Sequence, residues 1–290
     1  MKETIKQHYW LGYSSKEGFV ILDRTMPCNR PNSADKLVFT KCKNWQTFTE
    51  DKKKWLDSNK YVSIQALNLN PNQTQNANRL IDNYHQRVKS GIITGLKQNN
   101  VDSLWHLTHE KNIQSILEQG ILNHYKSHKT INRMIDISNK EVQFWRDLKE
   151  PYYQKKIHEY VPLFINYDNA MFYRLTRYEY PGQLCLIEIS LDALLNNVFL
   201  FTDRNASTKD ANFFGHHEDL NKLFWDTLQD ETWDWNSTLL TKQARQAEVL
   251  IYNKVPTRHI KKIYCSNEKM YRAQFNTYKD LISNQNKFIY

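Results

Sequence analysis

The sequence has little glycine or proline, with seven of each in 290 residues, which argues against a collagen-like chain or a long flexible linker. No run approaches the roughly 18 uninterrupted apolar residues that a membrane-spanning helix needs. The first residues, MKETIKQHYWLGY, lack the apolar stretch of a signal peptide. Nor is there a glycine-rich phosphate loop or a dinucleotide-binding fingerprint. We therefore expect a soluble, cytoplasmic protein without a membrane partner.

Cysteine is also scarce, and its spacing matches no zinc-binding pattern. The cysteines are Cys28, Cys42, Cys185 and Cys265. Neither the HH pair at 216–217 nor the HEY segment at 158–160 has a partner at the spacing of metal ligands. We expect reduced thiols, which suits the cytoplasm, and no metal cofactor.

Positive charge is abundant but unevenly placed. The 40 Lys and Arg residues exceed the 31 Asp and Glu residues, for a net charge of +9. Residues 1–100 hold 16 basic and 8 acidic side chains, a net of +8, which leaves 24 and 23, a net of +1, for residues 101–290. A local basic excess favours a polyanion or an acidic protein as the partner. It is equally typical of a solvated face.

The first third of the chain has the pattern of a small separate domain, residues 1–95. YWLGYSSKEGFVILDRTM and KLVFTKC alternate apolar and polar residues, which predicts short strands around a turn at 16–18. A short helix is expected at 45–60. The Asn- and Gln-rich segment 67–78, which contains Pro71, has the composition of a linker. A helix is predicted from there to about residue 100.

The remainder, residues 100–290, mixes strands and helices without a regular βαβ rhythm. SLWHLT predicts a strand, and the apolar positions Ile113, Ile116 and Leu117 predict a helix that ends at Gly120. Further strands are predicted at YVPLFIN, QLCLIEIS, AEVLIY and IKKIYC. A 40% hydrophobic composition is ample for a core. The expected fold class is therefore α+β.

One acidic residue stands at the entrance of a predicted buried strand. In RQAEVLI, residues 245–251, Glu248 directly precedes three aliphatic side chains. Such a carboxylate is either solvated by the preceding loop or kept there for chemistry. In WHLTH, His106 and Thr108 occupy alternate positions and so share one face of a strand, where a hydrogen-bonded core histidine is the ordinary outcome.

The order of five segments resembles the DarT family of toxin ADP-ribosyltransferases, which transfer ADP-ribose from NAD onto DNA bases. The segments are LWHLTHEKNIQSILEQGIL, DISNKEVQFWRD, EYVPLFINYDNAMFY, VFLFTDRNAS and RQAEVLI. The resemblance covers about residues 104–265. It implies an ADP-ribosyltransferase-like domain with a mixed split sheet, preceded by the small basic N-terminal domain. It also implies NAD as a substrate.

The resemblance assigns roles to six residues. Glu248 matches the catalytic glutamate, and Arg146, which we expect on an exposed helix face, falls where the family has an essential arginine. His106 and Thr108 match the pair that anchors NAD. The matching segment on the nicotinamide side contributes Met171 and Tyr173.

The same match departs from the family pattern at the acceptor side. Residues 167–171, Tyr-Asp-Asn-Ala-Met, stand where the family often has Pro-Arg-x-Pro-Met, so a basic group is lost. The segment from Phe214 to Gln243 holds Trp225, Trp233 and Trp235, which either stack on an unpaired base or fill the core.

The expected activity is toxin-type mono-ADP-ribosylation of a base in single-stranded nucleic acid, with DNA favoured. RNA bases and a protein side chain are the alternative acceptors, and a degenerate fold used only for binding is the non-catalytic alternative. The resemblance also implies an antitoxin protein as a partner. In chemical terms, breaking the nicotinamide–ribose bond builds positive charge on the ribose, which a carboxylate stabilises.

If residues 1–95 hold the nucleic acid electrostatically, affinity should fall steeply with salt as counterions are released from phosphates. A fragment of residues 100–290 should then show a shallower slope of log affinity against log salt. The choice of base should not change, since phosphate contacts position the strand while pocket contacts specify the base. Equal slopes for the fragment and the full chain would leave the basic segment free for an acidic antitoxin.

Overall fold

The computed structural model describes residues 10–14, 18–22, 36–39, 61–63, 71–131, 134–151, 153, 155–265, 276–283 and 287. The chain divides into two compact units, one formed by residues 1–88 and 151–153, the other by residues 89–150 and 154–290.

The first unit contains a four-stranded sheet in the order β2-β1-β3-β4. The strands are β1 (Trp10–Ser14), β2 (Gly18–Leu22), β3 (Lys36–Phe39) and β4 (Tyr61–Ser63). β1 pairs antiparallel with β2 and β3, whereas β3 and β4 are parallel. The strands predicted from the alternating pattern are confirmed. The helix predicted at 45–60 lies outside the described residues.

The prediction of a linker over 67–78 is wrong from residue 71 onward. Helix α2 (Pro71–Gln98) begins at the proline itself. Proline suits the first position of a helix, because its fixed φ is helical and its missing N–H has no partner there in any case. Near the C-terminal end of the helix, Ile92 and Leu96 are buried, each with 1% of its surface exposed. Residues 67–70 lie outside the described part of the chain.

The buried end of α2 also limits how the basic segment can be tested. A fragment that starts at residue 100 would lose Ile92 and Leu96 from the core of the second unit, and its stability would fall together with its charge. The salt measurement is therefore better made on the full chain with Lys52, Lys53 and Lys54 changed to Gln. Each neutralised lysine that contacts a phosphate of a single strand should lower the slope by roughly 0.7.

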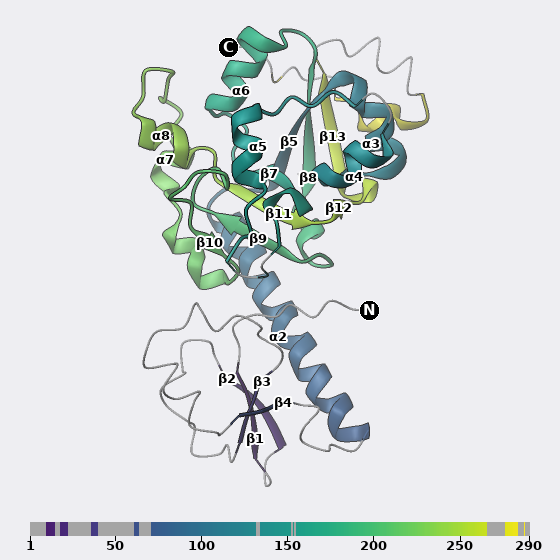
Figure 1. Ribbon diagram of the computed structural model, residues 1–290, viewed down its shortest axis with the longest axis vertical. Helices are drawn as coiled ribbons and strands as arrows, with labels where there is room; N and C mark the ends of the chain where they lie inside the picture. The colour runs from purple at the N-terminus through teal and green to yellow at the C-terminus, as the bar shows by residue number, and fades with distance from the viewer. Residues whose placement is uncertain are drawn as a thin grey trace. The chain divides into compact units, whose positions relative to one another are not determined.

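The second unit is built on a seven-stranded sheet in the order β10-β9-β11-β7-β5-β8-β13, shown in Figure 1. Its strands are β5 (Ser103–His109), β7 (Tyr160–Phe164), β8 (Leu184–Ser190), β9 (Phe199–Thr202), β10 (Phe213–Phe214), β11 (Glu248–Tyr252) and β13 (Ile260–Cys265). All neighbouring pairs are antiparallel. The α+β prediction and the five predicted strands of this unit are confirmed. The sheet was expected to be mixed, but its described strands are antiparallel throughout.

The sheet has a narrow join near its middle. β5 and β7 share the single register pair Trp105↔Phe164, whereas β5 and β8 share seven pairs. Two short strands, β6 (Ile121–Leu122) and β12 (Lys254–Val255), pair separately. The four strands β10, β9, β11 and β7 therefore form one half of the sheet, and β5, β8 and β13 the other.

Short helices surround the sheet (Figure 1). They are α3 (Ile113–Gln119), α4 (His124–Thr130), α5 (Lys140–Arg146), α6 (Ala170–Arg174), α7 (Trp225–Gln229) and α8 (Leu239–Ala244). α3 ends at Gly120 as predicted, with φ +82°, a conformation that favours glycine. Among the helices the structure describes, none is long and apolar enough to cross a bilayer.

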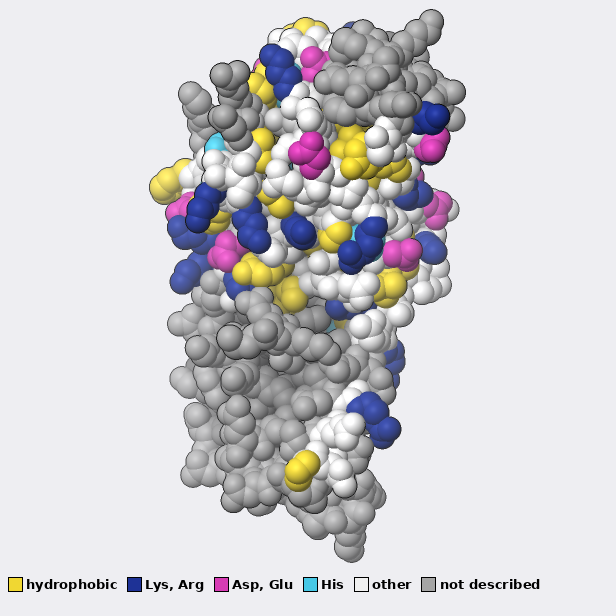
Figure 2. Space-filling model, turned by 90° about the vertical axis from the view of Figure 1, so that its right-hand side faces the viewer, with side chains coloured by type: hydrophobic (Ala, Val, Ile, Leu, Met, Phe, Trp, Pro, Cys, Tyr) yellow, Lys and Arg dark blue, Asp and Glu magenta, His cyan; other side chains and the backbone are white. Residues whose placement is uncertain are grey.

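The surface of the second unit mixes both signs of charge. On the face in Figure 2, Lys and Arg side chains are spread over the described part with Asp and Glu among them. This agrees with the near-balanced count of 24 basic and 23 acidic residues over 101–290.

Candidate active site

Glu248 is the first residue of β11 and is almost completely buried, with 1% of its surface exposed. Its backbone N–H donates to the Thr202 hydroxyl on the neighbouring strand at 3.2 Å. One carboxylate oxygen, Oε1, accepts from Nη2 of Arg146 at 2.6 Å, and Oε2 accepts from the Ala206 N–H at 3.4 Å. The carboxylate is therefore not solvated by the loop before it.

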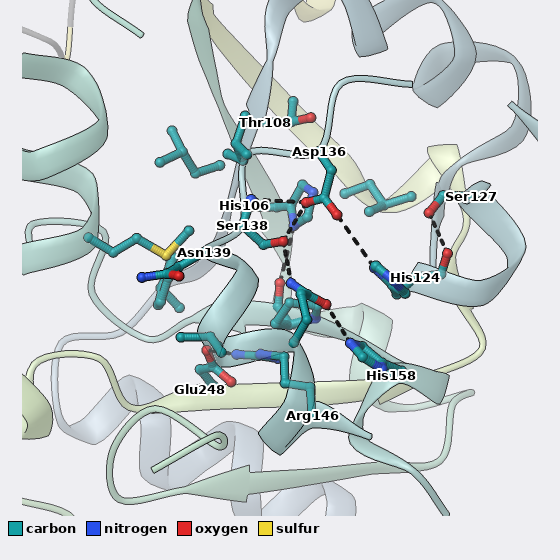
Figure 3. A pocket seen from close by; sticks show the side chains of 18 of the residues that line it. His106, Thr108, His124, Ser127, Asp136, Ser138, Asn139, Arg146, His158 and Glu248 are labelled. Carbon is teal, nitrogen blue, oxygen red and sulfur yellow. Dashed lines mark hydrogen bonds and ion pairs between the residues drawn. The ribbon is translucent and has the colours of Figure 1, made fainter. Parts of the chain in front are cut away.

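Arg146 is the last residue of α5, and its side chain is 11% exposed. The expectation of an arginine on an exposed helix face is wrong, because the side chain turns into the site toward Glu248 (Figure 3). Its Nη2 also donates to Oδ1 of Asn205 at 3.3 Å. Asn205 in turn accepts from the Ser207 N–H at 3.0 Å, which keeps its oxygen facing the guanidinium.

Burial and the ion pair have opposite effects on the pKa of Glu248. Burial raises the pKa of this carboxyl, while the charge and hydrogen bond of Arg146 and the Ala206 N–H work in the opposite direction. A buried ion pair costs desolvation energy that its own attraction barely repays, and removing one partner leaves an uncompensated charge. Arg146 is thus the group that allows Glu248 to be ionised inside the protein.

His106 and Thr108 of β5 both line the same cavity, as their alternate positions predicted. His106 Nδ1 lies 3.1 Å from the Pro162 carbonyl. Because a carbonyl can only accept, Nδ1 carries the proton. Burial lowers the pKa of His106 despite this bond, so the ring is neutral and its Nε2 is an acceptor.

Thr108 contacts Asn112, a residue of the site that was not predicted from the sequence. Its hydroxyl accepts from Nδ2 of Asn112 at 3.1 Å. Asn112 also donates to the Ile135 carbonyl at 2.8 Å and accepts from the Ile135 N–H at 3.0 Å. A buried side-chain amide therefore fastens the segment at 134–139, which forms one wall of the cavity, to strand β5.

The cavity itself has a volume of about 380 Å³ and is lined mainly by apolar groups. Arg146 and Glu248 contribute to its wall, and so does Met171 of α6. Tyr173 is not among the lining residues. Its ring instead stacks on Trp235, with ring centroids 5.3 Å apart and planes at 22°. Trp235 does line the cavity and is 41% exposed.

The wall opposite Glu248 is polar, and its side chains are not among the site residues predicted from the sequence. His124, Asp136, Ser138 and His158 line it (Figure 3). The His124 and His158 rings are stacked, 4.2 Å apart at 18°. Burial, and then the neighbouring histidines, lower the pKa of His124 to about 4, while burial and Arg146 lower the pKa of His158. Both rings are thus neutral at neutral pH.

The segment before Glu248 is held by the buried guanidinium of Arg245, which is 1% exposed. It donates to the backbone carbonyls of Asp168, Thr227 and Asp230 at 3.0, 2.8 and 2.6 Å. It also pairs with the Asp168 carboxylate at 3.2 Å, and the same oxygen accepts from Trp233 Nε1 at 2.7 Å. Asp168, where the sequence departs from the family pattern, is thus a structural anchor. Trp233 is part of this anchor. Trp235, in contrast, lines the cavity.

The family model described as "ssDNA thymidine ADP-ribosyltransferase, DarT" matches residues 105–285, more than half of the chain. The chain belongs to the DarT family. A "DNA ADP-ribosyl transferase" of Thermus sp. (strain 2.9) is 25% identical over 174 residues, which are 58% of this chain and 82% of that relative. A Thermosipho africanus (strain H17ap60334) "DNA ADP-ribosyl transferase-DNA ADP-ribosyl glycohydrolase fusion protein" is 24% identical over 63% of this chain and 46% of its own length.

Solved DarT structures share the fold. That of Thermus sp. 2.9 DarT in complex with ADP-ribosylated ssDNA matches with a TM-score of 0.56 at 23% identity, over 66% of this chain and 97% of the other. The NAD⁺ complex of the same DarT matches with a TM-score of 0.54 at 22% identity, over 66% and 98%. These likenesses show the antiparallel α+β architecture of the domain.

Membership of the DarT family decides several questions that the sequence left open. The chain is an NAD-dependent DNA ADP-ribosyltransferase, and its family acts on thymidine in single-stranded DNA. DNA is thus the acceptor, in preference to RNA or protein. DarT proteins are toxins of toxin–antitoxin pairs.

We predict that Arg146→Met destabilises the protein more at pH 8 than at pH 5. Without the guanidinium, the folded-state pKa of Glu248 rises further above its ordinary value of 4.5. A raised folded pKa gives stability that is present below the unfolded pKa and lost as pH rises through the folded pKa. The deficit should approach about 3–5 kcal/mol at high pH, as for a broken buried pair. Urea unfolding at several pH values measures it.

The matched control is Arg146→Met with Glu248→Gln, which removes the titrating group and should abolish the pH dependence of the deficit. A single variant whose stability follows that of the unmodified chain at every pH would contradict the ion pair.

Proposed function

We propose that Glu248 and Arg146 form the catalytic pair for ADP-ribose transfer from NAD to thymidine. The observation that carries the proposal is a buried carboxylate, held by a 2.6 Å ion pair, in the wall of a cavity of suitable size for a ligand. A buried carboxylate that is paired with a specific charge in the wall of a cavity is typical of a functional group.

In the proposed reaction the bond between the ribose C1 and nicotinamide breaks, and nicotinamide leaves as a neutral molecule. Positive charge then develops on the ribose, and the Glu248 carboxylate stabilises it in a site shielded from water. A ring nitrogen of the thymine forms the new bond to C1 and loses its proton, which Glu248 can accept. Arg146 keeps Glu248 ionised until that step. Both of its contacts use Nη2, so other guanidinium N–H groups can donate to the NAD diphosphate.

His106 and Thr108 are proposed to anchor NAD on strand β5. With Nδ1 engaged by the Pro162 carbonyl, the neutral His106 offers Nε2 as an acceptor to a ribose hydroxyl or an amide. The Thr108 hydroxyl accepts from Asn112, which leaves its own O–H to donate. Met171 supplies apolar surface for the nicotinamide ring. Tyr173 supports the site indirectly, by stacking under Trp235.

Trp235 is proposed to receive the acceptor base. Its ring is partly exposed at the cavity, is backed by Tyr173, and has Lys242 Nζ 4.8 Å from its centre. An aromatic platform with a cation beside it suits an unpaired base and its phosphate.

The basic segment of residues 1–95 is proposed to hold the DNA strand through its phosphates, on the strength of its charge excess. An antitoxin protein is the second proposed partner. The fusion of a transferase with a DNA ADP-ribosyl glycohydrolase in the Thermosipho africanus relative supports a partner that removes ADP-ribose.

Glu248→Gln keeps the shape of the side chain and removes its charge. We predict that NAD still binds, while transfer to a thymidine-containing oligonucleotide falls at least about a hundredfold, the low end for loss of a general base. Glu118→Gln, at an exposed position of α3, is the control and should leave both unchanged. Calorimetry with NAD and a labelled-NAD transfer assay measure the two quantities. A Glu248→Gln enzyme with near-normal transfer would exclude the carboxylate from the chemistry.

Trp235→Ala should weaken binding of single-stranded DNA by the free energy of one stacked base, about 1–3 kcal/mol. NAD affinity should change less than DNA affinity, and Trp235→Phe should restore most of the DNA affinity because it keeps a π-face. Fluorescence anisotropy with a labelled oligonucleotide measures the effect. If the alanine variant binds the oligonucleotide as tightly as the unmodified chain, the base stacks elsewhere.

A further inference from the structure

Three side chains at one end of the cavity carry donor atoms close to one another. His124 and His128 lie four residues apart on α4 and so share one face of the helix, with ring centroids 4.2 Å apart. Asp136 comes from the segment that follows. The three donor atoms all lie within 4.8 Å of one another, and Figure 3 shows His124 and Asp136 facing each other across this end of the cavity.

The spacing of these donors suits a tetrahedral ion. Asp136 Oδ2 lies 3.2 Å from His128 Nε2 and 3.8 Å from His124 Nδ1. Tetrahedral Zn²⁺ with ligands at about 2.0–2.1 Å has neighbouring ligand atoms roughly 3.3–3.4 Å apart. Both separations lie within half an ångström of that edge, and the two histidine donors lie within 4.8 Å of each other, so rotation of the side chains would bring all three groups onto one ion.

Neighbouring groups hold the donors in place. The second oxygen of Asp136, Oδ1, accepts from the Ser138 N–H at 2.9 Å and from the Ser138 hydroxyl at 2.5 Å, which leaves Oδ2 toward the histidines. The His124 ring is fixed in its plane by stacking on His158. Support of this kind orients the ligands of metal sites in general. The three side chains are 29%, 47% and 32% exposed, so an ion can reach them.

We propose that His124, His128 and Asp136 bind a divalent transition metal such as Zn²⁺, and that the bound ion obstructs NAD. Two imidazoles and a carboxylate are ligands that Zn²⁺ accepts, and three protein ligands leave a fourth position open. His124 and Asp136 line the cavity, so the ion would occupy space and polar groups at its wall. The proposed obstruction of NAD depends on the proposed function, in which NAD binds in this cavity. The proposed metal binding does not depend on it.

His128 provides a clean test because it does not line the cavity. Equilibrium dialysis of the untagged full chain with Zn²⁺ should show one bound equivalent more than the His128→Ala variant. His128→Cys should restore that equivalent, since a thiolate replaces an imidazole as a zinc ligand. Among the described residues a second cluster, His216 to Glu218, has donors within the same distance. His217→Ala is therefore the matched control, and it should leave the His128-dependent equivalent in place.

NAD binding gives a second readout. With free Zn²⁺ at ten times its own Kd, competition should raise the apparent Kd for NAD about elevenfold in the unmodified chain. The same Zn²⁺ should leave NAD binding by His128→Ala unchanged, and this variant also controls for chelation of Zn²⁺ by NAD.

Equal Zn²⁺ stoichiometry in the unmodified chain and in His128→Ala would overturn the metal site. A bound ion that leaves the apparent Kd for NAD unchanged would overturn the obstruction. Failure of the chain to bind NAD in the absence of metal would instead count against the function proposed for the cavity.

Discussion

The structure of the site depends on placing one carboxyl group, paired with an arginine, where water is excluded. Glu248 is buried at the entrance of a central strand, and its charge is tolerated because Arg146, 102 residues earlier in the chain, meets it there. The pair draws together helix α5, the loop after β9 and strand β11. A solvated carboxylate would keep an ordinary pKa but would stabilise developing charge far less, because water screens it.

Polar side chains hold this arrangement in place from two sides of the cavity. Asn205 contacts the guanidinium, and Thr202 fixes the backbone of Glu248, so both members of the pair are held from the same strand and loop. On the opposite side Asn112 joins strand β5 to the segment at 134–139. Amides are suited to such links because one side chain both donates and accepts, without adding charge to a dry site.

Much of the fold and part of the site could be predicted from the sequence. The aliphatic run after Glu248 predicted β11 and the segment SLWHLT predicted β5, while the His106–Thr108 spacing predicted that both side chains share a face. The helical start at Pro71 was missed because proline and polar residues are typical of both linkers and first helical turns. The burial of Arg146 was also missed, since periodicity within one short helix does not reveal which distant carboxylate its last side chain meets. The closeness of Asp136 to His124 and His128 arises only in the folded chain, and no linear spacing encodes it.

Arg245 lies three residues before Glu248. Its hydrogen bond to the Asp230 carbonyl joins the two ends of the loop 231–244, which carries Trp235. Its guanidinium binds backbone carbonyls of Asp168, Thr227 and Asp230, so three of its four hydrogen bonds do not depend on which side chains those positions carry. Sequence changes between residues 231 and 244 can therefore reshape the proposed acceptor side without moving the carboxylate. An enzyme built this way can diverge in the DNA context it prefers while its NAD chemistry stays the same.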